Sequence, residues 1–270
     1  MSEKKIQKIA VLVSMTDSDK MLILSGLKIA SLFNKELCLI FNSAKTTKSN
    51  PVKIRQILLD YKKALKDEIP GFKISVLILN TSYSLLPEIL ADEYETILII
   101  ADSNKYRKYS KAVYSSPVPF LFINPGTKLS TFKKITLPVD LREGNSETAL
   151  WSSYFGRLNN SEIIIIAANH KEKYGRQQVA KNIARAKNLF QKLSVRHKIF
   201  KGTKSSIYNH FEALDFAISS GSDMLMVLGS TTLTPLDYIV GLPEKKILKR
   251  AGNMAVLLVN SRRDNYLLCN

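Results

Sequence analysis

The chain has few of the residues that build covalent or metal-bound frameworks. Of its 270 residues only two are cysteine, Cys38 and Cys269, and three are histidine, His170, His197 and His210. Neither a disulfide framework nor a cysteine-based metal site is therefore expected. The histidines also lack the mutual spacing of metal ligands. We predict no metal site.

Long apolar runs are missing as well. No stretch approaches the roughly 18 apolar residues that cross a bilayer, and the first residues lead into a short strand-like segment without a signal-peptide core. With 45% hydrophobic and 23% charged residues, the composition is that of a globular protein. We expect a cytoplasmic protein that makes no use of a membrane.

Common catalytic motifs are absent too. The sequence contains no Gly-Lys-Ser/Thr phosphate loop, no Gly-x-Gly-x-x-Gly and no Gly-x-Ser-x-Gly. These absences disfavour P-loop kinases and ATPases, dinucleotide-dependent dehydrogenases and α/β-hydrolases. We expect a protein that is not an enzyme.

Positive charge, in contrast, is in excess. The chain has 40 Lys and Arg against 23 Asp and Glu, a net charge of +17, which would attract an anionic partner. The cations are spread over both halves, mostly as lysine, without a dense basic block or an aromatic-basic RNA motif. This pattern favours a solvated surface, and we do not expect nucleic acid as a partner.

The sequence repeats itself, with an offset that grows from 126 residues at the first segment to 136 at the last. Segment 8–14 is echoed by 134–140, 96–103 by 223–230 and 119–124 by 255–260. Such a repeat indicates two similar domains in tandem, each large enough to bury its own core. Pro125-Gly126-Thr127 breaks the chain between them. We place one domain at 1–126 and the other at 127–270.

Each half alternates short apolar runs with longer segments of helical period. Near-continuous apolar runs are typical of parallel strands that are covered on both faces, and the helical spacers fit right-handed crossovers. The predicted fold class is α/β, with two tandem domains that each have a five-stranded, mostly parallel sheet and helices on both faces. The predicted strands are 9–14, 36–42, 73–79, 96–101, 118–124, 134–140, 162–168, 195–200, 223–229 and 254–260. The predicted helices are 18–33, 51–68, 83–93, 104–114, 145–158, 172–193, 206–220 and 240–251.

The two halves differ where open α/β sheets place their ligands. Between its last two strands the second half spends 25 positions, from Ser230 to Ala255, whereas the first half spends 16, from Ser103 to Pro119. This connection leaves the carboxyl end of the sheet, where strands form a crevice beside helix N-termini. The first half has no glycine from 72 to 125, so a backbone-lined anion site is not expected there.

Two short motifs of the second half stand at predicted strand ends: Pro138-Val139-Asp140 and, later, Leu228-Gly229-Ser230. They resemble the ends of the first strand and of a late strand in the universal stress protein (UspA-like) superfamily, specifically in its tandem members. Residues 241–251 are similar to the family's final helix and its approach. The resemblance implies a Rossmann-like fold, a role in stress response and, in the ATP-binding branch, a glycine signature for phosphates.

The glycine signature is degraded in this chain. The resemblance puts Gly229 and Gly241 at its first and third glycines, but its second glycine is Thr232 and the expected final hydroxyl is replaced by Leu242. A Cβ at Thr232 penalises positive φ. The resemblance therefore implies at most weakened binding of ATP or another adenine nucleotide.

The candidate cofactor-binding residues all belong to the second half: Pro138, Asp140, Gly229, Ser230, Thr232, Gly241 and Leu242. Two interpretations of Asp140 stay open, because its carboxylate would accept hydrogen bonds from a ribose or adenine group but Asp is also favoured in turns and helix caps. The alternatives to a nucleotide-binding stress protein are a nucleotide-independent regulatory scaffold with a basic surface and, less favoured, a nucleotide-dependent enzyme.

Two expectations concern the first half and the assembly. Tyr106, Tyr109 and Tyr114 lie among basic residues, and we expect them to cover the end of the sheet that lost its glycine loop. The resemblance also implies an intramolecular pseudo-dimer in which strands 118–124 and 254–260 lie at the interface, since they would otherwise be exposed apolar edges. A homodimer and an unidentified protein partner remain open.

Overall fold

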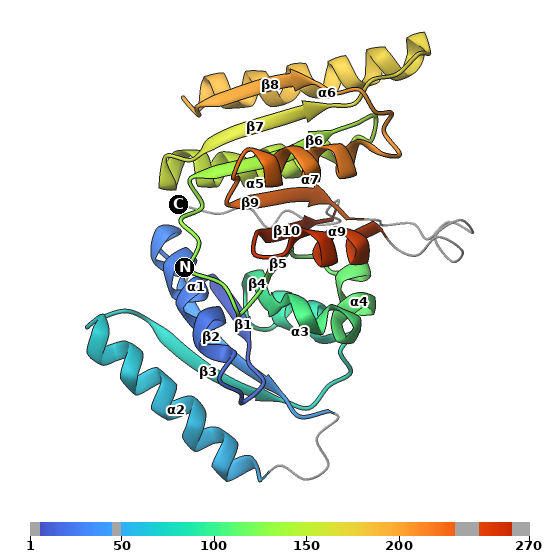
Figure 1. Ribbon diagram of the computed structural model, residues 1–270. Coiled ribbons are helices and arrows are strands. Elements are labelled where there is room, and N and C mark those ends of the chain that lie inside the picture. The colour runs from blue at the N-terminus through green and yellow to red at the C-terminus, as the bar shows by residue number, and fades with distance from the viewer. Residues whose placement is uncertain (1–5, 45–49, 230–242, 261–270) are drawn as a thin grey trace. The chain divides into compact units, whose positions relative to one another are not determined.

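The computed structural model describes residues 6–44, 50–229 and 243–260, and the fold is given for these residues. They form two compact units that divide between Leu129 and Ser130, compared with the predicted 126 and 127. Each unit alternates strands and helices along the chain (Figure 1). The predicted α/β class is confirmed.

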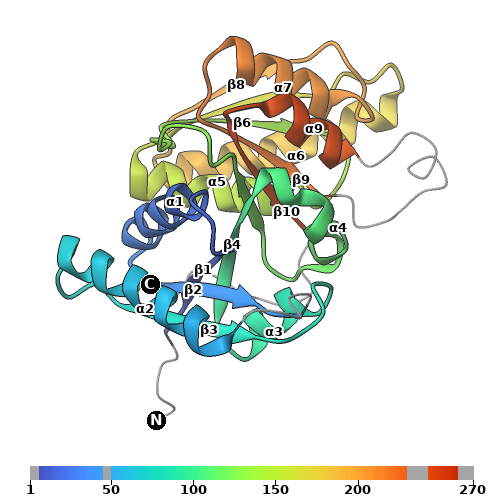
Figure 2. The same ribbon diagram turned by 60° about the horizontal axis from the view of Figure 1, so that its bottom comes forward.

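Unit 1 is a five-stranded parallel sheet in the order β3-β2-β1-β4-β5. Its strands are β1 (Lys8–Leu12), β2 (Glu36–Asn42), β3 (Ile74–Leu79), β4 (Thr96–Asp102) and β5 (Phe120–Ile123). Its helices are α1 (Asp19–Leu32), α2 (Pro51–Glu68), α3 (Leu86–Asp92), the 3-10 turn η1 (Ser103–Lys105) and α4 (Tyr106–Ser115). Figure 2 shows α2 alongside β3, against which it packs.

Unit 2 repeats this topology in the order β10-β9-β6-β7-β8, again with parallel pairs. Its strands are β6 (Lys134–Val139), β7 (Glu162–Ala167), β8 (His197–Lys201), β9 (Met224–Leu228) and β10 (Ala255–Val259). Its helices are α5 (Asn145–Asn159), α6 (Lys173–Lys192), α7 (Asn209–Ser219) and α9 (Pro243–Ala251). Helix α5 packs on α6 and α7 on α9, so helices pair on each face of the sheet.

The repeat extends to single backbone conformations. After α1 the chain turns at Asn34 with φ 51°, and after α5 it turns at Asn160, 126 positions later, with φ 53°. Asparagine tolerates this left-handed conformation at a helix end better than most residues do. The two helices therefore stop at equivalent points because the same residue type ends them.

The cores follow the predicted apolar runs. All five residues of β9 and of β10 are buried, and the single tryptophan, Trp151, is fully buried in α5. Among the described residues, no helix combines the length and the apolar character that crossing a bilayer requires. The same part of the chain holds no group of three His, Cys, Asp or Glu residues placed to bind a metal.

Candidate nucleotide crevice in unit 2

The first and fourth strands of unit 2 separate toward their carboxyl ends. The pairing of β6 with β9 joins Ile135 to Met224 and Thr136 to Leu225, whereas the pairing of β6 with β7 continues to Val139. This is also where the strand order changes direction, since β6 leads to β7 on one side and the chain later returns to β9 on the other. Open α/β sheets bind ligands at such a point.

Pro138 accounts for the early end of this pairing. The carbonyl of Lys134 accepts from Asp223 on the side of β9, while the carbonyl of Val139 accepts from Ala168 after β7, so even-numbered residues of β6 face β9. Pro138 therefore faces β9 and has no N–H to donate. Leu12 occupies the equivalent position in unit 1, where β1 pairs with β4 as far as Val11 and Ile100.

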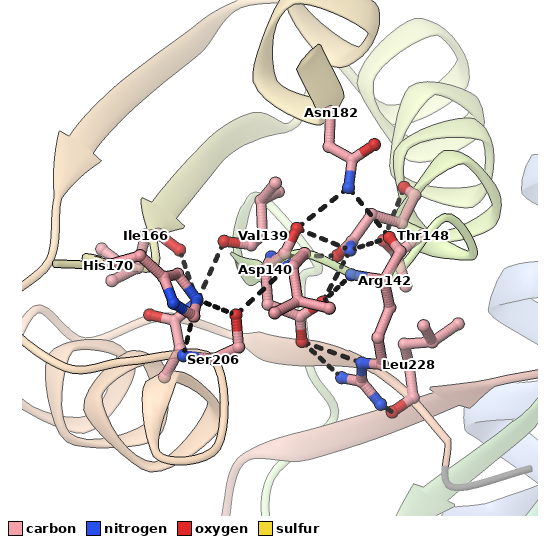
Figure 3. A network of polar contacts seen from close by, with 12 residues as sticks. Val139, Asp140, Arg142, Thr148, Ile166, His170, Asn182, Ser206 and Leu228 are labelled. Atoms are coloured by element: carbon pink, nitrogen blue, oxygen red, sulfur yellow. Dashed lines mark hydrogen bonds and ion pairs between the residues drawn. The ribbon is translucent and has the colours of Figure 1, made fainter. Parts of the chain in front are cut away.

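Asp140 directly follows β6 and is buried, with 2% of its surface exposed. One carboxylate oxygen accepts from the backbone N–H of Arg142 at 2.8 Å and from the Asn145 amide at 2.8 Å. The other accepts from Nε of Arg142 at 2.9 Å and lies 2.7 Å from its Nη2. Both oxygens are thus bonded by the chain's own groups (Figure 3).

The side chain of Arg142 connects the end of β6 with the end of β9. Its side chain is 39% exposed, and beyond Asp140 its Nη1 lies 3.5 Å from the carbonyl oxygen of Leu228, the last residue of β9. Figure 3 shows the guanidinium between these two partners. In this structure a cation of the chain itself occupies the space beside Asp140.

Two asparagines fix the loop that carries Asp140 and Arg142. Asn182 of α6 donates to the carbonyls of both residues at 2.9 Å, and Asn145 at the start of α5 also donates to the carbonyl of Asp140. Both amides are buried, 5% and 3% exposed. Because buried donors are costly to leave unpaired, these bonds hold the loop in one geometry.

His210 of α7 lies close enough to Arg142 and Asp140 for their charges to affect its pKa. Burial, with the nearby Arg142 guanidinium, lowers the pKa of His210 to about 4, although Asp140 opposes the shift. The ring is therefore neutral at pH 7, and its buried Nε2 has no hydrogen-bond partner within the described part of the chain. His170 differs in this respect, because its Nε2 is hydrogen-bonded to the Ser206 hydroxyl at 2.6 Å.

The candidate residues of the sequence are placed as follows. Pro138, Asp140 and Gly229 meet at the carboxyl ends of β6 and β9, whereas Ser230, Thr232, Gly241 and Leu242 lie outside the described residues. A Cβ on Gly229 would come within 2.3 Å of Oδ1 of Asn260, the end of a side chain that can rotate away. Local packing therefore gives no strong reason for a glycine at this position.

The corresponding place in unit 1 is filled by aromatic side chains. Tyr106 and Tyr109 are buried, 6% and 2% exposed, and the Tyr109 ring packs edge-on against Tyr83 with centroids 5.6 Å apart. Burial raises the pKa of Tyr109, whose phenol also interacts with Ser14. A cavity of about 70 Å³ remains beside Ser14, too small for a nucleotide. The expected covering of this sheet end is confirmed for these two tyrosines.

No protein-family model and no curated protein matches the sequence. A crystal structure of a universal stress protein from Archaeoglobus fulgidus is similar over 97% of this chain and 98% of its own, with a TM-score of 0.64 and 12% identity. This is the fold of the universal stress proteins. A functionally unknown protein from Pseudomonas aeruginosa PAO1 shares it, with a TM-score of 0.63, 14% identity and coverage of 95% and 93%.

Within this universal stress protein fold, three contributors to the site were not predicted from the sequence. Asn182 and His210 come from later helices, so no local spacing connects them to Asp140. Arg142 could have been found from the sequence, because an Asp side chain often accepts from the backbone N–H two residues later in a turn. Such a turn places Arg142 next to Asp140.

Proposed function

We propose that the chain is a non-enzymatic stress-response protein of the universal stress protein type, and that unit 2 binds an adenine nucleotide weakly. The observation that supports the site is the early end of the pairing between β6 and β9, with Asp140 and Gly229 just after these two strands. Weak binding follows from the contacts of Asp140, because a ribose hydroxyl can reach its carboxylate only if Arg142 moves.

On nucleotide binding, Arg142 would exchange its contact with the Asp140 carboxylate for one with a phosphate of the ligand. Its side chain is exposed enough to rotate, and a guanidinium bonds phosphate oxygens in the same two-pronged geometry as a carboxylate. Nucleotide binding would thus replace the Arg142–Asp140 pair with ribose–Asp140 and phosphate–Arg142 contacts. This exchange distinguishes ligands with a phosphate from those without one.

The test compares ATP with adenosine by calorimetry at millimolar concentration, after mass spectrometry of the purified protein for bound nucleotide. Wild type should bind ATP weakly and adenosine less tightly. Arg142→Ala frees Asp140 but removes the phosphate partner, so adenosine should gain affinity and the advantage of ATP should shrink. Arg185→Ala, which removes an exposed arginine of α6, is the control and should change neither. No heat with either ligand in any variant, from protein free of nucleotide, would refute the proposal.

The second candidate is a regulatory scaffold that needs no nucleotide. The complete hydrogen bonding of Asp140 within the chain favours it, since such a carboxylate is already satisfied as a turn and helix-start residue. Under this alternative, Asp140→Asn should lower the stability of unit 2 without affecting any ligand. The pairing of strands 118–124 and 254–260, the cytoplasmic location and a homodimer stay predictions, the last to be checked by light scattering.

A further inference from the structure

Unit 1 has a second, larger hollow at the carboxyl edge of its sheet, which shares Tyr83 and Lys108 with the small cavity beside Ser14. Its volume is about 530 Å³, within the range of small-molecule sites. Three segments line it: Ala44 after β2, residues 80–84 between β3 and α3, and the first turns of α4. Unlike the crevice of unit 2, it contains no glycine.

The charge of this hollow has one sign. Arg107, Lys108 and Lys111 of α4 line it together, and none of its lining residues that the structure describes is Asp or Glu. None of the three forms an ion pair with a carboxylate among the residues that the structure describes, whereas nearby Lys105 lies 3.4 Å from Asp102. Like charges at such helical spacings repel one another, so an anion placed between them would relieve this repulsion.

Lys108 is held in place by a ring. Its ammonium lies 4.4 Å from the centroid of Tyr83, and the Tyr83 ring packs in turn on buried Tyr109. Partial burial of the ammonium, with repulsion from Lys105, lowers the pKa of Lys108. A cation that is fixed by an aromatic contact loses less conformational freedom on binding than a freely solvated lysine does.

Hydroxyl-bearing residues line the same hollow. Thr81, Ser82 and Ser84 come from the loop after β3 and Ser110 from α4, and the hydroxyls of Ser82 and Ser84 are 3.0 Å apart. Several donors around a concave basic site suit the oxygens of a phosphate monoester, which accept many hydrogen bonds at once. A flat lysine-rich surface would offer the charge but neither the hollow nor the hydroxyls.

We propose that this pocket of unit 1 binds the phosphate group of a small phosphorylated molecule, held by Arg107, Lys108 and Lys111 and by the hydroxyls of residues 81–84. The site differs in kind from the crevice of unit 2. Among its described lining residues there is no carboxylate that would select a ribose, whereas the proposed site of unit 2 has Asp140.

The test measures binding of ribose 5-phosphate by calorimetry in about 150 mM salt, where long-range attraction is screened. Free ribose is the uncharged comparison and should not bind. Lys108→Gln/Lys111→Gln should weaken binding about tenfold or more. The control, Lys53→Gln/Lys63→Gln, removes the same charge from exposed positions of α2 and should change affinity less than about twofold. Circular dichroism checks that both double variants are folded.

Three outcomes would overturn the proposal. They are no binding at millimolar ligand, equal weakening in the pocket and control variants, or binding of RNA without binding of ribose 5-phosphate. The last would indicate an extended polyanion surface. Binding that persists in Asp140→Asn separates this site from the proposed nucleotide crevice, so either proposal can fail without the other.

Discussion

The Arg142–Asp140 pair makes a measurable contribution to the stability of unit 2. Arg142→Ala removes two side-chain contacts to Asp140, at 2.9 Å and 2.7 Å, from a carboxylate that is almost fully buried. Bonds that involve charged groups contribute about 1.5–3 kcal/mol, and stranding a buried charge costs about 3–5 kcal/mol. Asp140 keeps its bonds from the Arg142 backbone and Asn145, and the exposed side of the guanidinium admits water. We therefore expect a loss of about 2 kcal/mol in the free energy of unfolding.

The assay is urea denaturation followed by the fluorescence of Trp151. This is the single tryptophan of the chain and is fully buried in α5, so its signal reports on unit 2. Asp140→Asn and the double variant complete a mutant cycle. Because the two residues contact each other, the effects should fail to add by about 1–2 kcal/mol.

A matched control is available in the same unit. Lys198 and Glu162 form an ion pair at 2.7 Å, but their side chains are 60% and 30% exposed. Lys198→Ala should cost less than about 1 kcal/mol, as is usual for surface pairs. Additive effects of the Arg142 and Asp140 changes, or a loss no larger than that of the control, would refute the inference that Arg142 is a structural partner of Asp140.

Three further predictions use the same fluorescence assay. Gly229→Ala should change the free energy of unfolding of unit 2 by less than about 1 kcal/mol, because the new Cβ meets only the end of the Asn260 side chain, which can rotate away; a larger loss would contradict this argument. Burial raises the pKa of Glu212, but hydrogen bonds from the backbone N–H groups of Thr203 and Lys204 lower it more, so the pKa in the folded protein is below 4.5. The advantage of wild type over Glu212→Gln should therefore be complete above pH 4.5 and disappear as the pH falls through the folded pKa; an advantage that stays constant with pH would argue against it. Burial lowers the pKa of His210 from 6.5 to about 4, so wild type should lose up to about 3 kcal/mol between those pH values relative to His210→Asn. Parallel pH profiles of these two proteins would contradict a buried neutral ring.

The strands and helices could be predicted because each has its own local signal. The run at 36–42 and the helix that begins at Pro51 were predicted with the observed bounds. Helix α3 begins at Leu86, later than the predicted 83, because Ser82–Leu85 forms a turn whose carbonyl at Ser82 accepts from Leu85 and Leu86. Periodicity does not separate such a turn from the first turn of a helix.

The candidate site was predictable only in part, since its partners are far apart in sequence. The end of β6 was located from the repeat and the family resemblance, but its loop is held by Asn182, more than 40 positions away. The consequence of Pro138 was also hidden, because it depends on which side of the strand its missing N–H faces. Local sequence patterns show neither the hydrogen bonds of Asn182 to the loop nor the side of β6 on which Pro138 lacks a donor.

In both units a residue just after the first strand is hydrogen-bonded to the residue five positions later, at the start of the first helix. The two units differ in which of these two residues is the carboxylate. In unit 1 the carboxylate is on the helix, where Asp19 is fully buried and accepts from the backbone of Ser14 and Thr16. In unit 2 it is on the strand end, at Asp140, and the helix contributes the neutral amide of Asn145. Reaching Asp19 would require unfolding its loop, because backbone donors cannot rotate away. In Asp140 one oxygen is also bonded by a backbone N–H and by Asn145, but the other is bonded only by the partly exposed side chain of Arg142, whose rotation would free it. This difference makes unit 2 the half in which a ligand can compete for the carboxylate.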